Sequence, residues 1–128
     1  MIPARVQTYL RATAGLPWVW GCSDCMMWSA GLVFDVTGHD PAADLRETYA
    51  TEAEAADVVR AEGGYLKLMT RRLRGVLTRD DEARWGVGLV RHETFGRAAC
   101  IVADGRAVLK TDSGAMPSDA ALIARWRV

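Results

Sequence analysis

Apolar positions recur at helical spacing through the N-terminal part of the chain. Between residues 3 and 14 they fall on one stripe, with Pro3 near its start and Gly15 after its end, which predicts an amphipathic helix. Residues 25–36 are apolar around almost the whole circumference, and Gly38 follows them. This pattern is typical of a central, buried helix that ends at a glycine. The apolar residues of this second helix are Met26, Met27, Leu32, Val33, Phe34 and Val36.

Two more helices are predicted in the middle of the chain. Thr51-Glu52-Ala53-Glu54 is a capping box, and the helix that it begins ends at Gly63-Gly64. Residues 65–74 repeat the amphipathic pattern and predict a fourth helix. The arginines expected on the solvent-exposed face of that helix are Arg71, Arg72 and Arg74.

After a charged break at residues 78–84 the pattern changes to short apolar or alternating segments separated by turn residues. These segments are typical of strands, and Asp104-Gly105 indicates a two-residue hairpin between two of them. Helices followed by antiparallel strands predict an α+β fold, with residues 1–128 forming a single domain. The predicted strands are residues 85–91, 98–103, 106–111 and 122–128.

Composition and charge exclude several classes of function. The chain has 128 residues, half of them hydrophobic, with 16 basic and 16 acidic side chains. The absence of net charge argues against nucleic acid or an anionic membrane as a partner. No apolar run approaches the roughly 20 residues that span a bilayer, so no membrane insertion is expected. The N-terminus has no signal-peptide pattern, which predicts synthesis in the cytoplasm with reduced thiols.

The segment from Trp18 to Cys25 carries the candidate chemistry. Ser23 and Asp24 can cap the second helix, which places Cys25 in its first turn. Unpaired backbone N–H groups and the helix dipole stabilise a thiolate there, and this is how a cysteine nucleophile is activated. The alternative is that Cys25 is a small buried hydrophobic residue.

The spacing of the cysteines leaves two further alternatives. Cys22 and Cys25 have the separation of a redox pair, although no strand precedes them as a thioredoxin-like motif requires. A zinc site would need four ligands, and beyond this pair the chain offers Cys100 and two separated histidines. We therefore expect no metal and no cofactor.

Several short motifs resemble known families. Val19-Trp20-Gly21 and Asp24-Cys25, followed by an antiparallel meander, resemble the NlpC-type branch of papain-like cysteine peptidases, which cleave peptide stems of bacterial cell walls. A larger set of segments is similar to a family of small uncharacterised proteins that phages, prophages and gene-transfer agents encode in tail-gene modules. Those segments are Val19–Gly21, Asp24–Cys25, Val36–Pro41, Asp44–Arg46, Tyr49–Thr51 and Ala124–Val128.

The resemblance implies a papain-like, NlpC-type arrangement and a location near the tail tip of a phage-like virion. There the protein would be a structural or cell-wall-contacting component on a degenerate peptidase fold, with other tail-tip or hub proteins and peptidoglycan as partners. One alternative is an active peptidoglycan stem-peptide endopeptidase. Another is a cytoplasmic assembly factor of the tail.

The resemblance also assigns candidate site residues. Cys25 takes the nucleophile position, but the position of the catalytic histidine falls on Arg97, which stays protonated and cannot act as a general base. His92 ends the preceding strand and is the remaining candidate base, and backbone N–H groups at the helix start would bind the oxyanion. The alternative, which we favour, is that His92 and Glu93 are exposed residues at the edge of a loop. Trp18, Trp20 and Trp28 are candidate groove residues, and the alternative, which we favour, is that these large aromatic side chains pack in the core. Arg97 either lowers the pKa of the Cys25 thiol or pairs with Asp24 and closes the cleft, and we favour closure.

Overall fold

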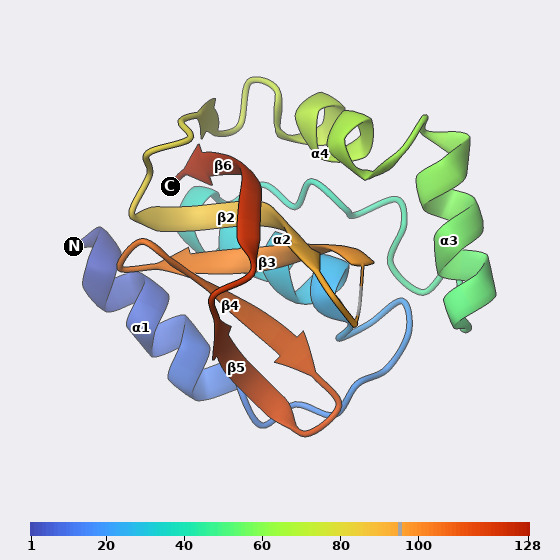
Figure 1. Cartoon of the computed structure of the whole chain (residues 1–128), viewed down its shortest axis with the longest axis horizontal. Coiled ribbons are helices and arrows are strands. Elements are labelled where there is room, and N and C mark those ends of the chain that lie inside the picture. Colours follow the sequence, from blue (N-terminus) through green and yellow to red (C-terminus); the bar gives the residue numbers. More distant parts are fainter. Residues whose placement is uncertain (95) are drawn as a thin grey trace.

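The computed structural model describes residues 1–94 and 96–128 and confirms the α+β class (Figure 1). Phe95, in the predicted loop between two strands, lies outside the described residues. Most ends of the four helices lie within two residues of the predicted ends. The helices are α1 (Ile2–Thr13), α2 (Cys25–Thr37), α3 (Glu52–Ala61) and α4 (Tyr65–Leu73).

The strands form one antiparallel sheet in the order β1-β6-β2-β3-β4-β5. Two of them were missed by the sequence prediction: β1 lies in the charged break, and β5 contains Pro117. Because β5 is an edge strand, a proline without an N–H group is tolerated in it. The strands are β1 (Thr78–Arg79), β2 (Trp85–His92), β3 (Gly96–Ala103), β4 (Arg106–Thr111), β5 (Gly114–Ser118) and β6 (Ala121–Arg127).

Helix α2 begins and ends where the sequence predicts. The Asp24 carboxylate accepts a hydrogen bond from the backbone N–H of Met27, and Gly38 ends the helix with a positive φ of 78°. Seven residues of α2 are buried, but Phe34 is 55% exposed. The buried residues are Met26, Met27, Trp28, Ser29, Ala30, Leu32 and Val33. The prediction that apolar residues bury the whole circumference of α2 is therefore wrong at Phe34, which lies on its outer face.

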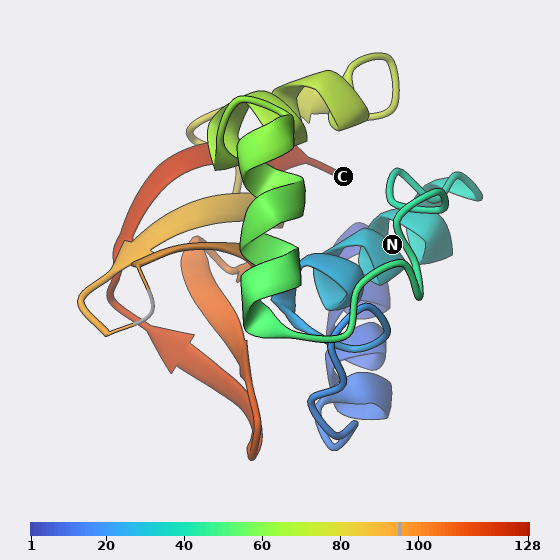
Figure 2. The ribbon, with the colours of Figure 1, turned by 90° about the vertical axis from the view of Figure 1, so that its right-hand side faces the viewer.

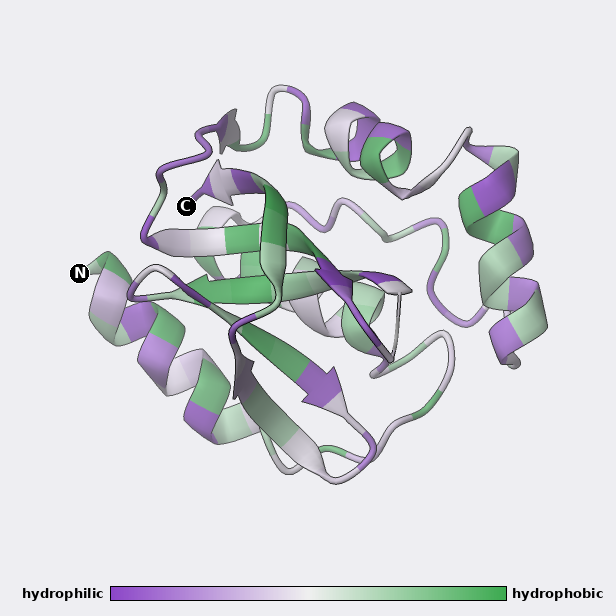
Figure 3. Ribbon diagram, in the orientation of Figure 1, coloured by the Kyte–Doolittle hydropathy of each residue, from purple (hydrophilic) through white to green (hydrophobic). Residues whose placement is uncertain are grey.

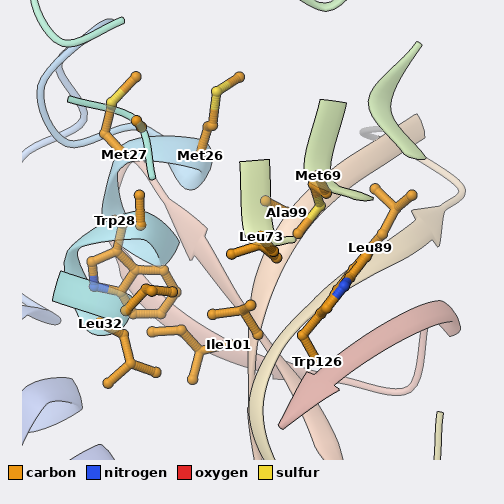
Figure 4. Packing of buried hydrophobic residues seen from close by; sticks show 14 of the residues in the cluster. Met26, Met27, Trp28, Leu32, Met69, Leu73, Leu89, Ala99, Ile101 and Trp126 are labelled. Atoms are coloured by element: carbon orange, nitrogen blue, oxygen red, sulfur yellow. The ribbon is translucent and has the colours of Figure 1, made fainter. Parts of the chain in front are cut away.

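The main core lies between α2 and the sheet. Figure 4 shows Trp28 and Leu32 of α2 near Ile101 of β3, with side chains of α4 completing the layer. Helix α1 packs against α2 and also contacts β2 and β3, and the Tyr9 hydroxyl donates to the backbone oxygen of Trp28 at 2.6 Å. A Cβ at Gly31 would lie 2.2 Å from that hydroxyl oxygen, so the close approach of the two helices requires glycine there.

A second, smaller core lies on the other face of the sheet, and a bulge in β6 determines which residues of that strand reach each core. The β2–β6 pairing shifts register between Leu89 and Val90, where Ile123 is an extra residue in β6. A bulge of this kind bends a strand, and in Figure 1 β6 turns sharply along its length. As a result Ala124 packs in the main core while Leu122, two residues away, packs against the second cluster. The buried residues of this cluster are Val90, Cys100, Val102, Ala107 and Leu109.

The two helices in the middle of the chain differ in how firmly they are held. In α4, Arg72 binds both Asp44 and Glu62, with Arg72–carboxylate distances of 2.6 and 2.9 Å. The prediction of a solvated face is therefore wrong for Arg72. Helix α3 has no buried residue, and hydrophobic and polar residues alternate along it (Figure 3). Figure 2 shows α3 standing at one end of the molecule, in front of the sheet and α2.

Candidate functional site

A cleft of about 810 Å³ opens beside the start of α2. Its walls come from the loop before α2, the inward side of α3, the first residues of β3 and the last residues of β4. The β3–β4 pairing ends at Ile101 and Val108, and beyond this point the two strands diverge (Figure 1). The cleft thus lies where the sheet opens toward the N-terminus of α2.

Cys25 lies in this cleft, in the first turn of α2 as predicted. Its sulfur is 3.6 Å from the hydroxyl oxygen of Tyr65, the first residue of α4. Burial raises the pKa of the Cys25 thiol to about 11, the hydrogen bond with Tyr65 lowers it, and the charge of Asp24 raises it. The pKa is thus shifted in the direction opposite to that expected for a thiolate at a helix start, because burial is the largest contribution, and the thiol is neutral at physiological pH.

Asp24 is buried and holds the cleft floor together. One carboxylate oxygen accepts from the backbone N–H of Met27, and the other accepts from the N–H of Gly21 and the hydroxyl of Tyr49, at 2.8 and 2.7 Å. Desolvation, followed by the hydrogen bond to Asp24, raises the pKa of the Tyr49 phenol, so Tyr49 stays a hydrogen-bond donor. Asp24 is therefore a structural anchor on which the turn before Cys25 is built.

Arg97 lines the same cleft as Cys25, and its side chain is exposed. The Asp24 carboxylate is already bound by three donors, and the described residues include no ion pair between it and Arg97. The expectation that Arg97 pairs with Asp24 and closes the cleft is thus wrong. Nor is the charge of Arg97 among the causes that shift the pKa of Cys25.

His92 lies elsewhere. Along β2, Leu89 packs in the main core and Val90 in the second one, so alternate residues face opposite sides of the sheet. His92 has the orientation of Val90, away from α2, and its Nδ1 accepts from the backbone N–H of Thr94 at 3.0 Å. It is not among the described residues that line the cleft. The structure therefore does not bring His92 and Cys25 together.

The tryptophans divide between cleft and core. Trp18 and Trp20 line the cleft and contact each other edge to face, with ring centroids 5.1 Å apart. Trp28 is buried, and its indole N–H donates to the Thr13 hydroxyl at 2.8 Å. Trp20 thus lies where a groove residue was predicted.

The other two cysteines do not join the site. Cys22 is exposed, and Cys100 is buried in the second core, where burial raises the pKa of its thiol to about 12. Within residues 1–94 and 96–128, no group of three or more His, Cys, Asp or Glu side chains is arranged to hold a metal ion. Over the same residues, no helix is both long and apolar enough to cross a membrane.

Tyr65 and Lys110 are among the cleft residues that were not identified from the sequence. Tyr65 comes from a helix 40 positions away from Cys25, and no local pattern indicates that pairing. Lys110 is only 4% exposed, and its ammonium donates to the backbone oxygens of Leu16 and Thr111 at 2.7 and 2.8 Å. A lysine inside an otherwise apolar strand was the available signal, since buried lysines are rare.

Fold and cleft together define a small α+β domain with a neutral cysteine thiol at the start of its central helix. The profile of one protein family matches residues 2–128, and the chain belongs to that family, described as Domain of unknown function (DUF6950). Comparison with curated proteins and with solved structures found no match.

Proposed function

We propose that this protein is a non-hydrolytic, cell-wall-contacting component of the tail-tip region of a phage-like particle, built on a degenerate papain-like, NlpC-type fold. The observation that carries the proposal is the chemistry around Cys25. A cysteine peptidase needs a nucleophile and a base within hydrogen-bonding reach of each other. Here the neighbour of the Cys25 sulfur is the Tyr65 hydroxyl, at 3.6 Å.

The protonation state of the thiol supports the absence of hydrolysis. A pKa of about 11 leaves a thiolate fraction on the order of 10⁻⁴ at pH 7. No imidazole lies among the described residues that line the cleft, and Arg97 is a permanent cation at the position that the peptidase resemblance gives to the base. The location in a tail rests on the resemblance of the short motifs to tail-module proteins.

The open cleft favours a binding role over a purely structural one. About 810 Å³ of space with aromatic, apolar and charged walls is within the size range of sites that hold small ligands or peptides. The same openness favours the second candidate, an active peptidoglycan endopeptidase, because Cys25 remains reachable from the cleft.

The test is incubation of the purified protein with cell-wall sacculi and with soluble muropeptides. We expect the protein to sediment with sacculi, Cys25→Ala to sediment equally, and mass spectrometry to detect no cleaved muropeptide. Turnover that Cys25→Ala abolishes would establish the peptidase instead. Failure of both proteins to sediment would remove the cell-wall role.

Location is tested separately by mass spectrometry of purified particles. We expect the protein in intact particles, at a stoichiometry similar to that of tail-tip proteins. Presence in the producing cells with absence from the particles would contradict the proposal and identify an assembly factor.

A further inference from the structure

Two arginines meet at the end of the β2–β3 hairpin that borders the cleft. Arg91 and Arg97 are directly opposite each other in the ladder and, by strand alternation, lie on the same face of the sheet as Leu89 and Ala99. Ala99 lines the cleft, and so does Arg97. The two guanidinium groups therefore extend from the cleft side of the sheet.

Placing Arg91 and Arg97 opposite each other destabilises the hairpin in the protein without a ligand. Like charges directly opposite each other in an antiparallel pair of strands destabilise that pair. Both side chains are exposed, and neither forms an ion pair or side-chain hydrogen bond with another described residue. Glu93, in the turn between the strands, is also exposed and pairs with neither. Two arginines at directly opposite positions of the ladder, neither of them in an ion pair with a described residue, can present their guanidinium groups to one oxyanion, which each can bind bidentately.

Other charges in the cleft limit the kind of anion. Asp24 is fully bound by its three donors, but Glu52 and Asp112 also line the cleft and are exposed. Asp112 offsets the charge of the Lys110 ammonium. The carboxylates of Glu52 and Asp112 would repel a dianion such as phosphate. A ligand carboxylate bound at the arginine end carries a single negative charge and would bring no excess charge into the cleft.

The wall opposite the sheet indicates what accompanies the carboxylate. Helix α3 presents Ala55, Ala56 and Val59 to the cleft, and none of them is fully buried by the protein. Small apolar side chains one turn apart form a shallow apolar strip, which fits small apolar groups on an elongated ligand. Trp18 and Trp20 continue this apolar surface toward the start of α2.

We propose that Arg97, with Arg91 beside it, binds the free carboxylate of a short peptide whose small apolar side chains lie along α3. This proposal rests on the proposed binding function and adds the chemical class of the ligand. The carboxylate is at the hairpin end of the cleft, and the peptide runs along α3.

The experiment is a titration of the ¹⁵N-labelled full-length protein with N-acetyl-alanyl-alanine, its C-terminal amide and inorganic phosphate. We expect the acid to bind about tenfold more tightly than the amide and to shift resonances of the β2–β3 hairpin and α3. Equal affinity for acid and amide would overturn the proposal. Phosphate binding at least as tightly as the acid would also overturn it, by identifying a general oxyanion site.

Variants locate the carboxylate. Arg97→Gln is expected to weaken binding of the acid about tenfold and to leave the amide unchanged, and Arg97→Lys to fall between them because an ammonium cannot bind bidentately. Arg74→Gln, an exposed arginine outside the cleft lining, is the matched control and should bind like the wild type. Unchanged acid binding in a folded Arg97→Gln would contradict the proposal.

Failure of this inference is distinguishable from failure of the proposed function. Sedimentation with sacculi together with equal binding of acid and amide would refute the carboxylate site and leave the cell-wall role. Selective acid binding by a protein that does not sediment with sacculi would support the carboxylate site and remove the cell-wall role.

Discussion

Asp24 connects three separate pieces of the cleft floor. Its carboxylate caps α2 through the Met27 N–H, holds the turn at Gly21, and accepts from Tyr49 in a distant loop. Gly21 itself has a φ of +79°, and a Cβ there would lie 2.4 Å from the Tyr49 backbone oxygen. The position of Cys25 therefore depends on a polar network that is buried and complete, with Asp24 at its centre.

The network predicts a large effect of removing the carboxylate. Asp24→Ala should lower the free energy of unfolding by about 2–4 kcal/mol, because it removes a helix cap and leaves the Tyr49 hydroxyl and the Gly21 N–H without their acceptor. Urea unfolding measures this change in the free energy of unfolding. Thr51→Ala, which removes the exposed cap of α3, is the control and should lose only about 1 kcal/mol. A loss from Asp24→Ala no greater than that of the control would mean that the buried bonds contribute nothing beyond capping.

At the scale of elements, Arg72 adds a polar anchor to α4, which also buries three apolar side chains, whereas α3 has no buried residue. The Arg72 guanidinium bridges Asp44 in the loop after α2 and Glu62 at the end of α3, and also donates to the backbone oxygen of Pro41 at 3.1 Å. These bonds raise the pKa of Arg72 and lower the pKa of the Asp44 carboxyl. Tyr65, the neighbour of Cys25, lies at the start of this same helix.

Removing this anchor should loosen one wall of the cleft. We expect Arg72→Ala to lower the free energy of unfolding by about 2–3 kcal/mol, since it leaves a half-buried Glu62 without its partner. Arg72→Lys should restore little, because an ammonium cannot reproduce the bidentate contacts. Arg71→Ala, one position away and exposed, should change stability by less than about 0.5 kcal/mol. Chemical denaturation compares the three, and equal effects at positions 71 and 72 would refute the anchoring role.

For the whole molecule, buried weak acids determine the response to alkaline pH. Burial raises the pKa of Cys25 to about 11 and the pKa values of Cys100 and Tyr9 to about 12. All three are acids whose neutral form is favoured in the folded state. Their contribution to stability is therefore complete below the pKa of the unfolded chain and is lost as pH rises through the folded values.

The free energy of unfolding should accordingly be flat between pH 6 and 8 and fall above about pH 9, by up to ~1.4 kcal/mol per pH unit for each thiol. Cys25→Ser removes one of these groups and should make the fall shallower between about pH 9 and 11. Cys22→Ser, at an exposed cysteine, is the matched control and should keep the wild-type slope. Thermal or urea unfolding at a series of pH values measures this slope, and identical slopes for Cys25→Ser and wild type would contradict a half-buried, neutral Cys25.

The sequence by itself determined the elements whose signals are local. Side-chain caps and glycines after the last turn fixed α2 and α3, and Asp104-Gly105, with positive φ at both residues, formed the predicted hairpin. The local cap also placed Cys25 in the first turn of α2. Such signals are readable because a cap or a two-residue turn completes its hydrogen bonds within a few residues of chain.

Only the tertiary structure decided which of these residues lie together in the cleft and which protonation state Cys25 has. The register of β2 and β3 put Arg97 in the cleft and His92 on the other face, since a shift of one residue reverses every side chain. Edge strand β5, with little apolar pattern of its own, formed because β4 offers it backbone partners. The neutral thiol of Cys25 depends on burial and on Tyr65 from a distant helix. The burial of a side chain and the face of the sheet on which it lies depend on contacts between segments far apart in the chain, and no local pattern encodes them.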